Sequence, residues 1–254
     1  FTIGNKNSLF PIRHSLFYPK MRLNKFIANS GYTSRRKAEE LITEGRVKVN
    51  SEVITEVGFK IDENTNPKVE VNGEIIHVEE QKTYLIFNKP RDYTCTKRKF
   101  INEKNIYELL PQEYQSLHYI GRLDKDSSGL MILTNDGDFT QETSHPKFDC
   151  SKIYEVELKG NLEKEDIKKF CNGLILDGQK TKETTIKIIR NTPYTTTIEI
   201  ELREGKKRQI RRMFDILNYK VLKLKRIQIG DIKLPNDLKE GQYSLLEAKL
   251  SLQS

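Results

Sequence analysis

Residues 121–133 read Gly121-Arg122-Leu123-Asp124-Lys125-Asp126-Ser127-Ser128-Gly129-Leu130-Met131-Ile132-Leu133. The apolar run at the end of this stretch is short and bounded by turn-forming residues, which predicts a buried strand. The Asp136-Gly137 pair that follows predicts a tight turn, and Asp138 is placed to cap the next helix. The sequence therefore predicts that Asp124 and Asp126 lie on a loop fixed by a rigid strand, a common place for chemistry.

The spacing of the acidic residues leaves several functions open. Asp124, Asp126 and Ser128 match the first ligand positions of a calcium loop, but Asn135 stands where the bidentate Glu is expected. The carboxylates could also form the acid pair of a glycosidase, if their separation fits, or bind magnesium in a nuclease. A solvated turn without catalytic function is the explanation that spacing alone favours.

Composition indicates a protein with a polyanionic partner. The chain has 254 residues, which makes two domains the natural expectation, and it carries a net charge of +8 with 31% charged residues. No apolar run approaches the roughly 18 residues of a membrane span, so we expect no membrane partner. The three cysteines are scattered at Cys95, Cys150 and Cys171, which predicts reduced thiols rather than a zinc site or disulfides.

Residues 1–20 differ from the rest of the chain. They contain Lys6, Arg13 and Lys20, together with serines, but no acidic residue. Such a composition resembles an organelle transit peptide, and Met21 opens a stretch that would serve as a bacterial N-terminus. We expect one of two origins for this segment. It is either the remnant of a plastid, apicoplast or mitochondrial targeting sequence, or an N-terminal arm without a targeting function on a protein of bacterial-type cytoplasm.

Residues 21–80 are predicted to form a small basic domain. Apolar residues at helical spacing predict two helices that are followed by Gly31 and Gly45, with Thr33 or Ser34 capping the second. Alternating valines from Val47 onward predict strands. The basic residues of this span are Arg22, Lys25, Arg35, Arg36, Lys37, Arg46 and Lys48.

This pattern of two helices joined by Thr33-Ser34-Arg35-Arg36 and followed by Gly45-Arg46-Val47-Lys48-Val49-Asn50 resembles the S4-type (αL) RNA-binding motif. The resemblance implies that the basic residues contact RNA phosphates. Phosphate contacts position a protein on RNA but carry little sequence information. A solvated basic face without a ligand is the simpler alternative.

The central stretch has a more specific resemblance. The order Gly121-Arg122-Leu123-Asp124, then Ser128-Gly129-Leu130, then Thr134-Asn135-Asp136-Gly137, resembles the central motif of the ribosomal-RNA pseudouridine synthases that modify single uridines. The resemblance implies that Asp124 is the catalytic residue. The implied reaction breaks the N1–C1′ bond of uridine, rotates the base and rejoins it through C5, so no cofactor and no metal are expected.

Two further motifs follow in the order of that family. Lys152-Ile153-Tyr154 opens a predicted strand, in which Tyr154 alone would be interpreted as a core aromatic residue. The resemblance implies instead that Tyr154 lies against the target base. Arg122, beside Asp124, is our candidate for the side chain that fills the space left by a flipped base.

The third motif lies at residues 204–214. Ile210, Met213 and Phe214 are spaced as on one face of a helix, which predicts that this face is buried. The resemblance implies that Arg211 forms a salt bridge with Asp124. The neighbouring basic residues are expected to contact RNA: Lys207, Arg208 and Arg212.

The remaining segments complete a predicted catalytic domain over residues 84–250. Tyr84–Phe87 is a predicted strand, and Asn88-Lys89-Pro90 follows with Asp92 where the family has Gly, a position that Asp tolerates better than most residues. Residues 163–171 are a predicted helix, and residues 184–189 and 196–202 a predicted antiparallel hairpin.

We therefore predict an α+β protein with three parts: an extension (1–20), an S4-type RNA-binding domain (21–80) and a catalytic domain with a mostly antiparallel mixed β-sheet flanked by helices (84–250). The predicted function is isomerisation of uridine in ribosomal RNA by a monomer, and His145-Pro146 favours the large subunit. A non-catalytic rRNA-binding assembly factor is the alternative from another class.

Overall fold

A computed structural model describes residues 20–78, 81–97, 101–144 and 149–246. The chain separates into two compact units, Phe1–Glu79 and Glu80–Ser254. The predicted extension, apart from Lys20, lies outside the described residues, and so does the His145-Pro146 pair. Within the described ranges, no helix has the length and hydropathy needed to cross a bilayer.

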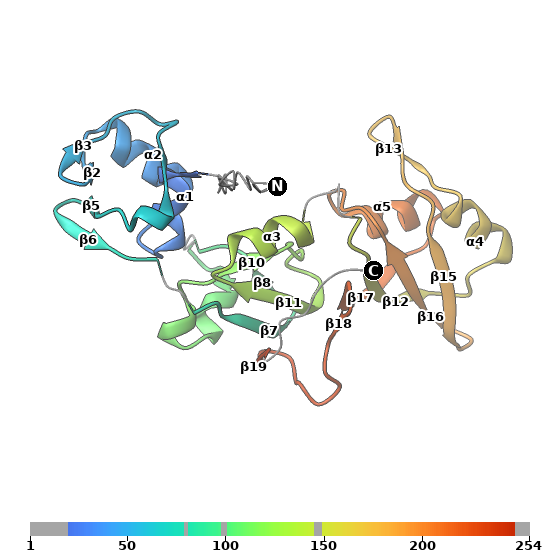
Figure 1. The fold of residues 1–254 in the computed structure, drawn as a ribbon. Coiled ribbons are helices and arrows are strands. Elements are labelled where there is room, and N and C mark those ends of the chain that lie inside the picture. The colour runs from blue at the N-terminus through green and yellow to red at the C-terminus, as the bar shows by residue number, and fades with distance from the viewer. Residues whose placement is uncertain (1–19, 79–80, 98–100, 145–148, 247–254) are drawn as a thin grey trace, which may run out of the picture. The chain divides into compact units, whose positions relative to one another are not determined.

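The first unit consists of two helices and short strands (Figure 1). Helix α1 spans Leu23–Asn29 and α2 spans Arg35–Thr43. The side chain of Ser34, rather than that of Thr33, caps α2 by accepting a hydrogen bond from the Lys37 N–H at 3.3 Å. The helices and strands bury one apolar cluster, which includes Leu23, Ile27 and Ile42.

The strands of this unit form two sheets. The larger has the order β3-β2-β5-β6, and the smaller pairs β1 with β4. Their bounds are β1 Met21–Arg22, β2 Val47–Val49, β3 Glu52–Val53, β4 Lys60–Ile61, β5 Val69–Val71 and β6 Glu74–Ile76, with a 3₁₀ turn η1 at Glu63–Thr65.

Nine of the described strands of the second unit form one mixed sheet, and β8-β9 and β13-β14 form two separate two-stranded sheets. Seven follow the order β15-β16-β12-β17-β11-β7-β19, while β10 pairs with β11 and β18 pairs with β17. The bounds are β7 Tyr84–Lys89, β10 His118–Ile120, β11 Ser128–Thr134, β12 Lys152–Lys159, β15 Thr185–Asn191, β16 Thr195–Leu202, β17 Val221–Ile229, β18 Ile232–Lys233 and β19 Tyr243–Leu245. The sheet is mostly antiparallel, which confirms the predicted fold class.

Helices cover part of this sheet. Helix α4 (Lys164–Cys171) and α5 (Gln209–Ile216) pack against β12, β16 and β17 through an apolar cluster that includes Phe170, Met213 and Phe214 (Figure 1). Helix α3 spans Gly137–Ser144. The shorter elements are β8 Tyr93–Thr94, β9 Lys104–Asn105, η2 Ile106–Leu109, η3 Gln112–Tyr114, β13 Ile175–Leu176 and β14 Gln179–Lys180.

The sheet is joined at its centre by β11 and β17. These strands are parallel and pair over Ser128↔Lys225 and Gly129↔Arg226. Gly129 has φ +108°, and a Cβ atom at this position would lie 2.2 Å from the backbone oxygen of Arg226. Glycine is therefore required for the strands to approach this closely.

Two local predictions are resolved by the structure. The helix after β11 is capped by Asp136, whose Oδ1 accepts hydrogen bonds from the N–H groups of Asp138 and Phe139 at 3.0 and 3.1 Å. The prediction that Asp138 is the cap was wrong, because the helix begins at Gly137, two residues earlier than a helix capped by Asp138 would begin. Asp92 adopts φ +68°, so the turn after Lys89-Pro90 forms without Gly.

Candidate active site

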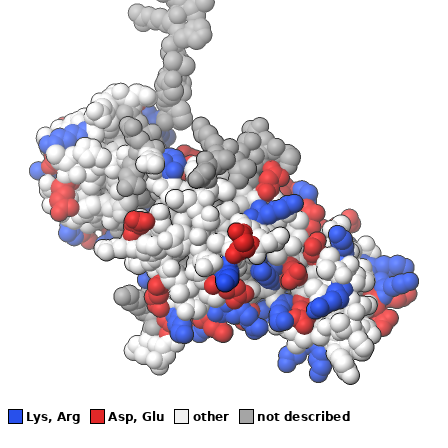
Figure 2. Space-filling view, turned by 90° about the horizontal axis from the view of Figure 1, so that it is seen from below, with Lys and Arg blue, Asp and Glu red and all other residues white. Residues whose placement is uncertain are grey.

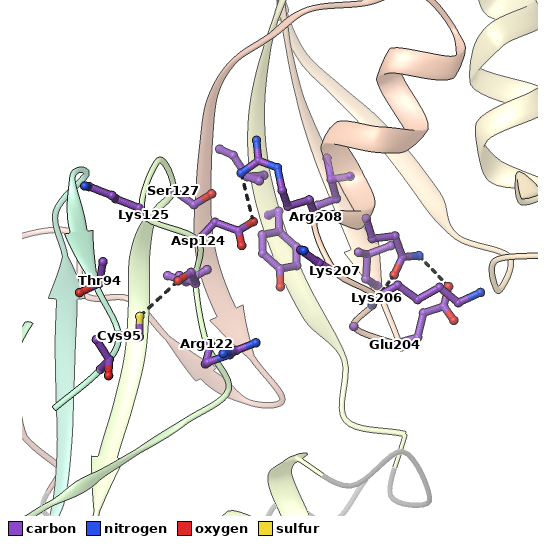
Figure 3. Close-up of a pocket in the computed structure, with 18 of the residues that line it drawn as sticks. Thr94, Cys95, Arg122, Asp124, Lys125, Ser127, Glu204, Lys206, Lys207 and Arg208 are labelled. Carbon is purple, nitrogen blue, oxygen red and sulfur yellow. Dashed lines mark hydrogen bonds and ion pairs between the residues drawn. The ribbon is translucent and has the colours of Figure 1, made fainter. Parts of the chain in front are cut away.

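Asp124 lies on the loop that joins β10 to β11 and lines a cavity of about 550 Å³. Thr94 and Cys95 lie on one side of Asp124, and the segment from Glu204 to Arg208 lies on the other (Figure 3). The Asp124 side chain is 39% exposed, so its carboxylate faces the open part of the cavity.

Lys89 holds this loop from one side. It is fully buried on β7, and its Nζ donates hydrogen bonds to the backbone oxygens of Pro90 at 2.9 Å, Ser127 at 2.7 Å and Lys125 at 3.4 Å. Burial lowers the pKa of Lys89, while neighbouring acidic groups oppose the shift. The Asp92 N–H also donates to the Lys125 oxygen at 2.7 Å. Since an unpaired buried ammonium is costly, the loop carbonyls and the lysine stabilise each other.

Arg226 holds the same loop from the other side. It is 1% exposed, and its Nε donates to the Leu130 oxygen at 2.8 Å while Nη2 donates to the Gly121 oxygen at 3.4 Å. The register of the sheet places Arg226 between Tyr154 on β12 and Gly129 on β11. The two ends of the Asp124 loop are thus bonded to one buried guanidinium.

The predicted ion pair between Asp124 and Arg211 does not form among the described residues. Arg211 instead places its Nε 3.2 Å from Asp126 Oδ2, and its Nη2 donates to the Asp126 backbone oxygen at 2.9 Å. The cation beside Asp124 is Arg208, whose Nη1 lies 3.9 Å from Asp124 Oδ2. The prediction failed because Arg211, which is buried on α5, contacts Asp126 and Ser127, whereas the more exposed Arg208, at φ +51° before the helix, reaches both Asp124 and Asp126.

Asp126 connects these two arginines. Its carboxylate accepts hydrogen bonds from Nη1 and Nη2 of Arg208 at 3.1 and 3.0 Å. Burial acts to raise the pKa of Asp126, but the hydrogen bond from Arg208 and the charge of Arg211 outweigh it and hold the pKa below its ordinary value. Asp126 is therefore a stable carboxylate two residues from Asp124.

Tyr154 lines the same cavity as Asp124. Its ring is partly buried and packs against the apolar cluster under α5 and against the cluster around β7 and β11. Both interpretations of Tyr154 in the sequence are therefore compatible with its position: it contributes to two cores and also faces the cavity.

Several of the predicted RNA-binding residues surround the cavity, namely Arg122, Lys207 and Arg208. Arg212 does not line it and instead forms a bidentate pair with Asp177 at 2.9 and 2.6 Å. Figure 2 shows positive and negative side chains interleaved on the face that it presents, rather than one continuous basic field.

In the first unit, most of the predicted RNA-binding residues are exposed: Arg22, Arg35, Arg36, Lys37, Arg46 and Lys48, with Lys25 partly exposed. Lys37 pairs with Glu40 at 2.6 Å, and Arg46 pairs with Glu44 at 3.1 Å. The exposed arginines at the start of α2 lie beside its capped N-terminus, where backbone N–H groups also favour anions.

The described residues bring no group of three or more His, Cys, Asp or Glu side chains into a metal-binding arrangement. Asp124 and Asp126, which the sequence allowed as calcium ligands, instead face arginines. The groups that line this cavity include a carboxylate, a guanidinium and a phenol, and these are suited to nucleophilic or proton-transfer chemistry on a flat, anionic substrate.

Comparison with known proteins identifies the family. The family model described as RNA pseudouridylate synthase matches residues 83–215. The chain belongs to this family. An S4 domain model matches residues 21–66, which confirms the resemblance inferred for the first unit.

Relatives span nearly the whole chain. Ribosomal large subunit pseudouridine synthase B of Bacillus subtilis (strain 168) is 39% identical over 215 residues, covering 84% of this chain and 87% of its own length. Ribosomal small subunit pseudouridine synthase A of Vibrio cholerae is 33% identical, covering 89% and 96%. A crystal structure of a pseudouridylate synthase superposes with a TM-score of 0.64 at 31% identity, over 89% of this chain and 96% of that one.

Three residues of this family member's site were missed as such from the sequence. Lys89 was noted only within a motif, Arg226 was not singled out, and Asp126 was considered only as a metal ligand or as one of an acid pair. Their functions depend on contacts with residues distant in the chain, such as Arg226 with Leu130, which no local pattern indicates. One signal was available: in β17, Arg226 follows Leu222 and Leu224 at alternate positions, so the period-2 pattern placed a charged side chain on the apolar face.

Proposed function

We propose that this protein isomerises uridine to pseudouridine in ribosomal RNA. The observation that carries the proposal is the meeting of Asp124, Tyr154 and Arg208 at one cavity, from a loop, a strand and a helix start that are far apart in the chain. The relatives named as ribosomal pseudouridine synthases support ribosomal RNA as the substrate.

In the proposed reaction, Asp124 acts at the ribose of the target nucleotide. As a carboxylate it either attacks the sugar or removes a proton from it, and the N1–C1′ bond breaks. The base then rotates and C5 bonds to C1′, while Asp124 either leaves the sugar or returns the proton that it removed. The C5 proton leaves and N1 gains a proton, so the reaction is balanced without an oxidant. The Nη1 atom of Arg208 lies 3.9 Å from Asp124 Oδ2, so a positive charge stands beside the proposed reacting carboxylate.

Tyr154 and Arg122 are proposed to hold the nucleotide. The target base must leave its stack to reach Asp124, which costs a few kcal/mol. The Tyr154 ring lines the cavity and is proposed to pack on the base and to assist removal of the C5 proton. Arg122 is exposed beside Asp124 and is proposed to occupy the vacated space.

The central experiment compares wild-type protein with Asp124→Asn on ribosomal RNA carrying tritium at uridine C5. Replacement of the C5 hydrogen releases tritium to water, so wild type should release it and the variant should not, while both bind RNA equally. Asp215→Asn, an exposed residue on α5, is the matched control and should be fully active. Turnover by Asp124→Asn close to wild type would refute the proposed function.

Two further arms address the alternatives. A chelator should leave tritium release intact, whereas loss of activity that magnesium restores would favour the nuclease. RNA binding without tritium release by wild type would favour the non-catalytic assembly factor. We propose the large-subunit RNA as the substrate, and mapping both ribosomal RNAs tests this choice.

We also propose that the first unit anchors the protein on RNA and that one copy suffices. Every group of the proposed site belongs to a single chain, and sizing chromatography with and without RNA can test whether one copy suffices.

Arg35→Gln with Arg36→Gln should weaken binding and reduce the dependence of affinity on salt. Lys60→Gln with Lys68→Gln removes the same charge from exposed positions outside the helices and should have a smaller effect. Equal effects of both pairs would remove α2 as the anchor.

A further inference from the structure

Asp126 occupies a central place among the charged groups of the cavity. We propose, on the basis of the proposed function, that Asp126 is a positioning residue: it binds the Arg208 guanidinium and so prevents it from closing on the Asp124 carboxylate. Asp124 then receives the charge of Arg208 but keeps its oxygens open to the ribose.

The distances support this division. Both outer nitrogens of Arg208 donate to Asp126, at 3.1 and 3.0 Å, which is the bidentate geometry that a carboxylate and a guanidinium prefer. The Nη1 atom lies 3.9 Å from Asp124 Oδ2, within ion-pair range but beyond hydrogen-bond length. Both outer N–H groups of Arg208 therefore bond to Asp126, and Asp124 interacts with Arg208 only through the charge of the guanidinium.

Arg208 could bind Asp124 if Asp126 released it. Its side chain is 41% exposed, and the side chain of Asp124 is 39% exposed, so neither is fixed by packing. The fork is within about 1 Å of hydrogen-bonding distance to Asp124 already. A guanidinium bound to both Asp124 oxygens would cover the atoms that must reach the ribose.

Asp126 also pairs with a second cation, the buried Arg211, and so connects the Arg208 pair to the folded core. Arg211 has a side chain that is 9% exposed, and its Nε, 3.2 Å from Asp126 Oδ2, finds no hydrogen-bond acceptor within the described part of the chain. Without the Asp126 carboxylate, Arg208 and Arg211 would share Asp124 as their nearest acidic group. Repulsion between Arg208 and Arg211, together with attraction to the Asp124 carboxylate, would then favour movement of Arg208 toward Asp124.

A structural role for Asp126 predicts a different result from a positioning role. Loss of a purely structural pair would lower stability and leave the form of the rate–pH profile unchanged. Loss of the fork would lower the rate of the chemical step, shift the acid limb of that profile and leave RNA affinity nearly unchanged, because RNA contacts elsewhere persist. The consequences can therefore be separated by measuring rate, affinity and stability together.

The experiment uses the full chain and ribosomal RNA with tritium at uridine C5, under single-turnover conditions. Asp126→Asn should slow tritium release by about 10- to 100-fold, the range expected for misplacement of a reacting group. RNA affinity should stay within about threefold, since the loss concerns the chemical step. The acid limb should move to lower pH, because Arg208 now contacts Asp124 directly.

Three variants sharpen the result. Asp177→Asn breaks the comparable bidentate pair with Arg212 on the same helix and should leave the rate unchanged. Asp126→Glu keeps a carboxylate and should recover part of the rate. The third variant, Asp126→Asn combined with Arg208→Gln, is compared with Arg208→Gln alone: because Asp126 is proposed to act through Arg208, the two should release tritium at similar rates.

Two outcomes would overturn the proposal: a double variant clearly slower than Arg208→Gln alone, or a rate loss in Asp126→Asn that parallels its loss of thermal stability with an unshifted pH profile. A crystal structure of Asp126→Asn tests the fork without using activity, since Arg208 should lie within hydrogen-bond distance of Asp124; Arg208 pointing into solvent would also overturn it. Absence of tritium release by wild type would instead refute the proposed function.

Discussion

The substitution Gly129→Ala, which adds a single methyl group, is expected to lower the free energy of unfolding strongly. It lies at φ +108° on β11, opposite Arg226 on β17, where the two strands pair over only Ser128↔Lys225 and Gly129↔Arg226. A Cβ atom would lie 2.2 Å from the Arg226 oxygen and 2.7 Å from its nitrogen. Both are backbone atoms, so no side-chain rotation can relieve the contact in Gly129→Ala.

The size of the effect follows from these contacts. The positive φ alone strains a residue with a Cβ by about 1–3 kcal/mol. Moving β17 away far enough to clear the methyl group removes one or two ladder hydrogen bonds, at about 1 kcal/mol each. We therefore expect Gly129→Ala to lower the free energy of unfolding by about 2–5 kcal/mol, a large part of the roughly 5–15 kcal/mol of a typical domain.

Urea unfolding of the full chain measures this loss, and Gly160→Ala provides the matched control. Gly160 has φ +84°, but a Cβ atom there would meet nothing within 4 Å. Its substitution should therefore cost only the conformational strain, about 1–2 kcal/mol. Equal destabilisation by the two variants would refute the argument that close approach of β11 and β17 requires Gly129.

Two further predictions concern buried charged or titratable groups. Lys89→Met should lower the free energy of unfolding by about 1–3 kcal/mol and slow tritium release, because the loop carbonyls that Lys89 binds lose their donor; an unchanged urea midpoint would contradict this. Burial, with the charge of Lys97, lowers the pKa of His118 below its ordinary 6.5. Stability linked to its neutral ring is therefore complete above pH 6.5 and is lost as pH falls through the lower folded pKa. Thermal unfolding at pH 7.5 and 5.5 should show this loss in wild type and less of it in His118→Gln.

The elements that the sequence predicted correctly are those with local periodicity. The face of α5 formed by Ile210, Met213 and Phe214 is buried as the i, i+3, i+4 spacing predicts. The short apolar run after the Asp124 loop is a fully buried strand, β11, flanked on both sides by other strands. In both cases, the pattern reports burial directly and needs no knowledge of distant residues.

The errors concern choices between neighbouring residues of the same type. Asp136 and Asp138 are both good helix caps, and they lie two positions apart in the sequence. Asp124 and Asp126 are both possible partners for Arg211, and the family resemblance names the motif but does not fix the side-chain geometry. Arg208 has a left-handed backbone, and its guanidinium lies near both carboxylates, whereas that of Arg211 pairs with Asp126.

The site lies where two differently packed parts of the second unit meet. On one side, α4 and α5 bury β12 and β16, and on the other a separate cluster packs around β7 and β11. Tyr154 contacts both clusters, and Arg226 bonds across the junction to Leu130 and Gly121.

The loop that carries Asp124 starts at Gly121 and runs directly into β11 at Ser128, so its position depends on how closely the parallel strands approach. Arg208, which faces the loop, directly precedes α5 on the other side. Any change that widens the junction must therefore separate Asp124 from Arg208 as well as unpair two strands, and this is why Gly129, which touches neither side chain, is expected to affect both stability and catalysis.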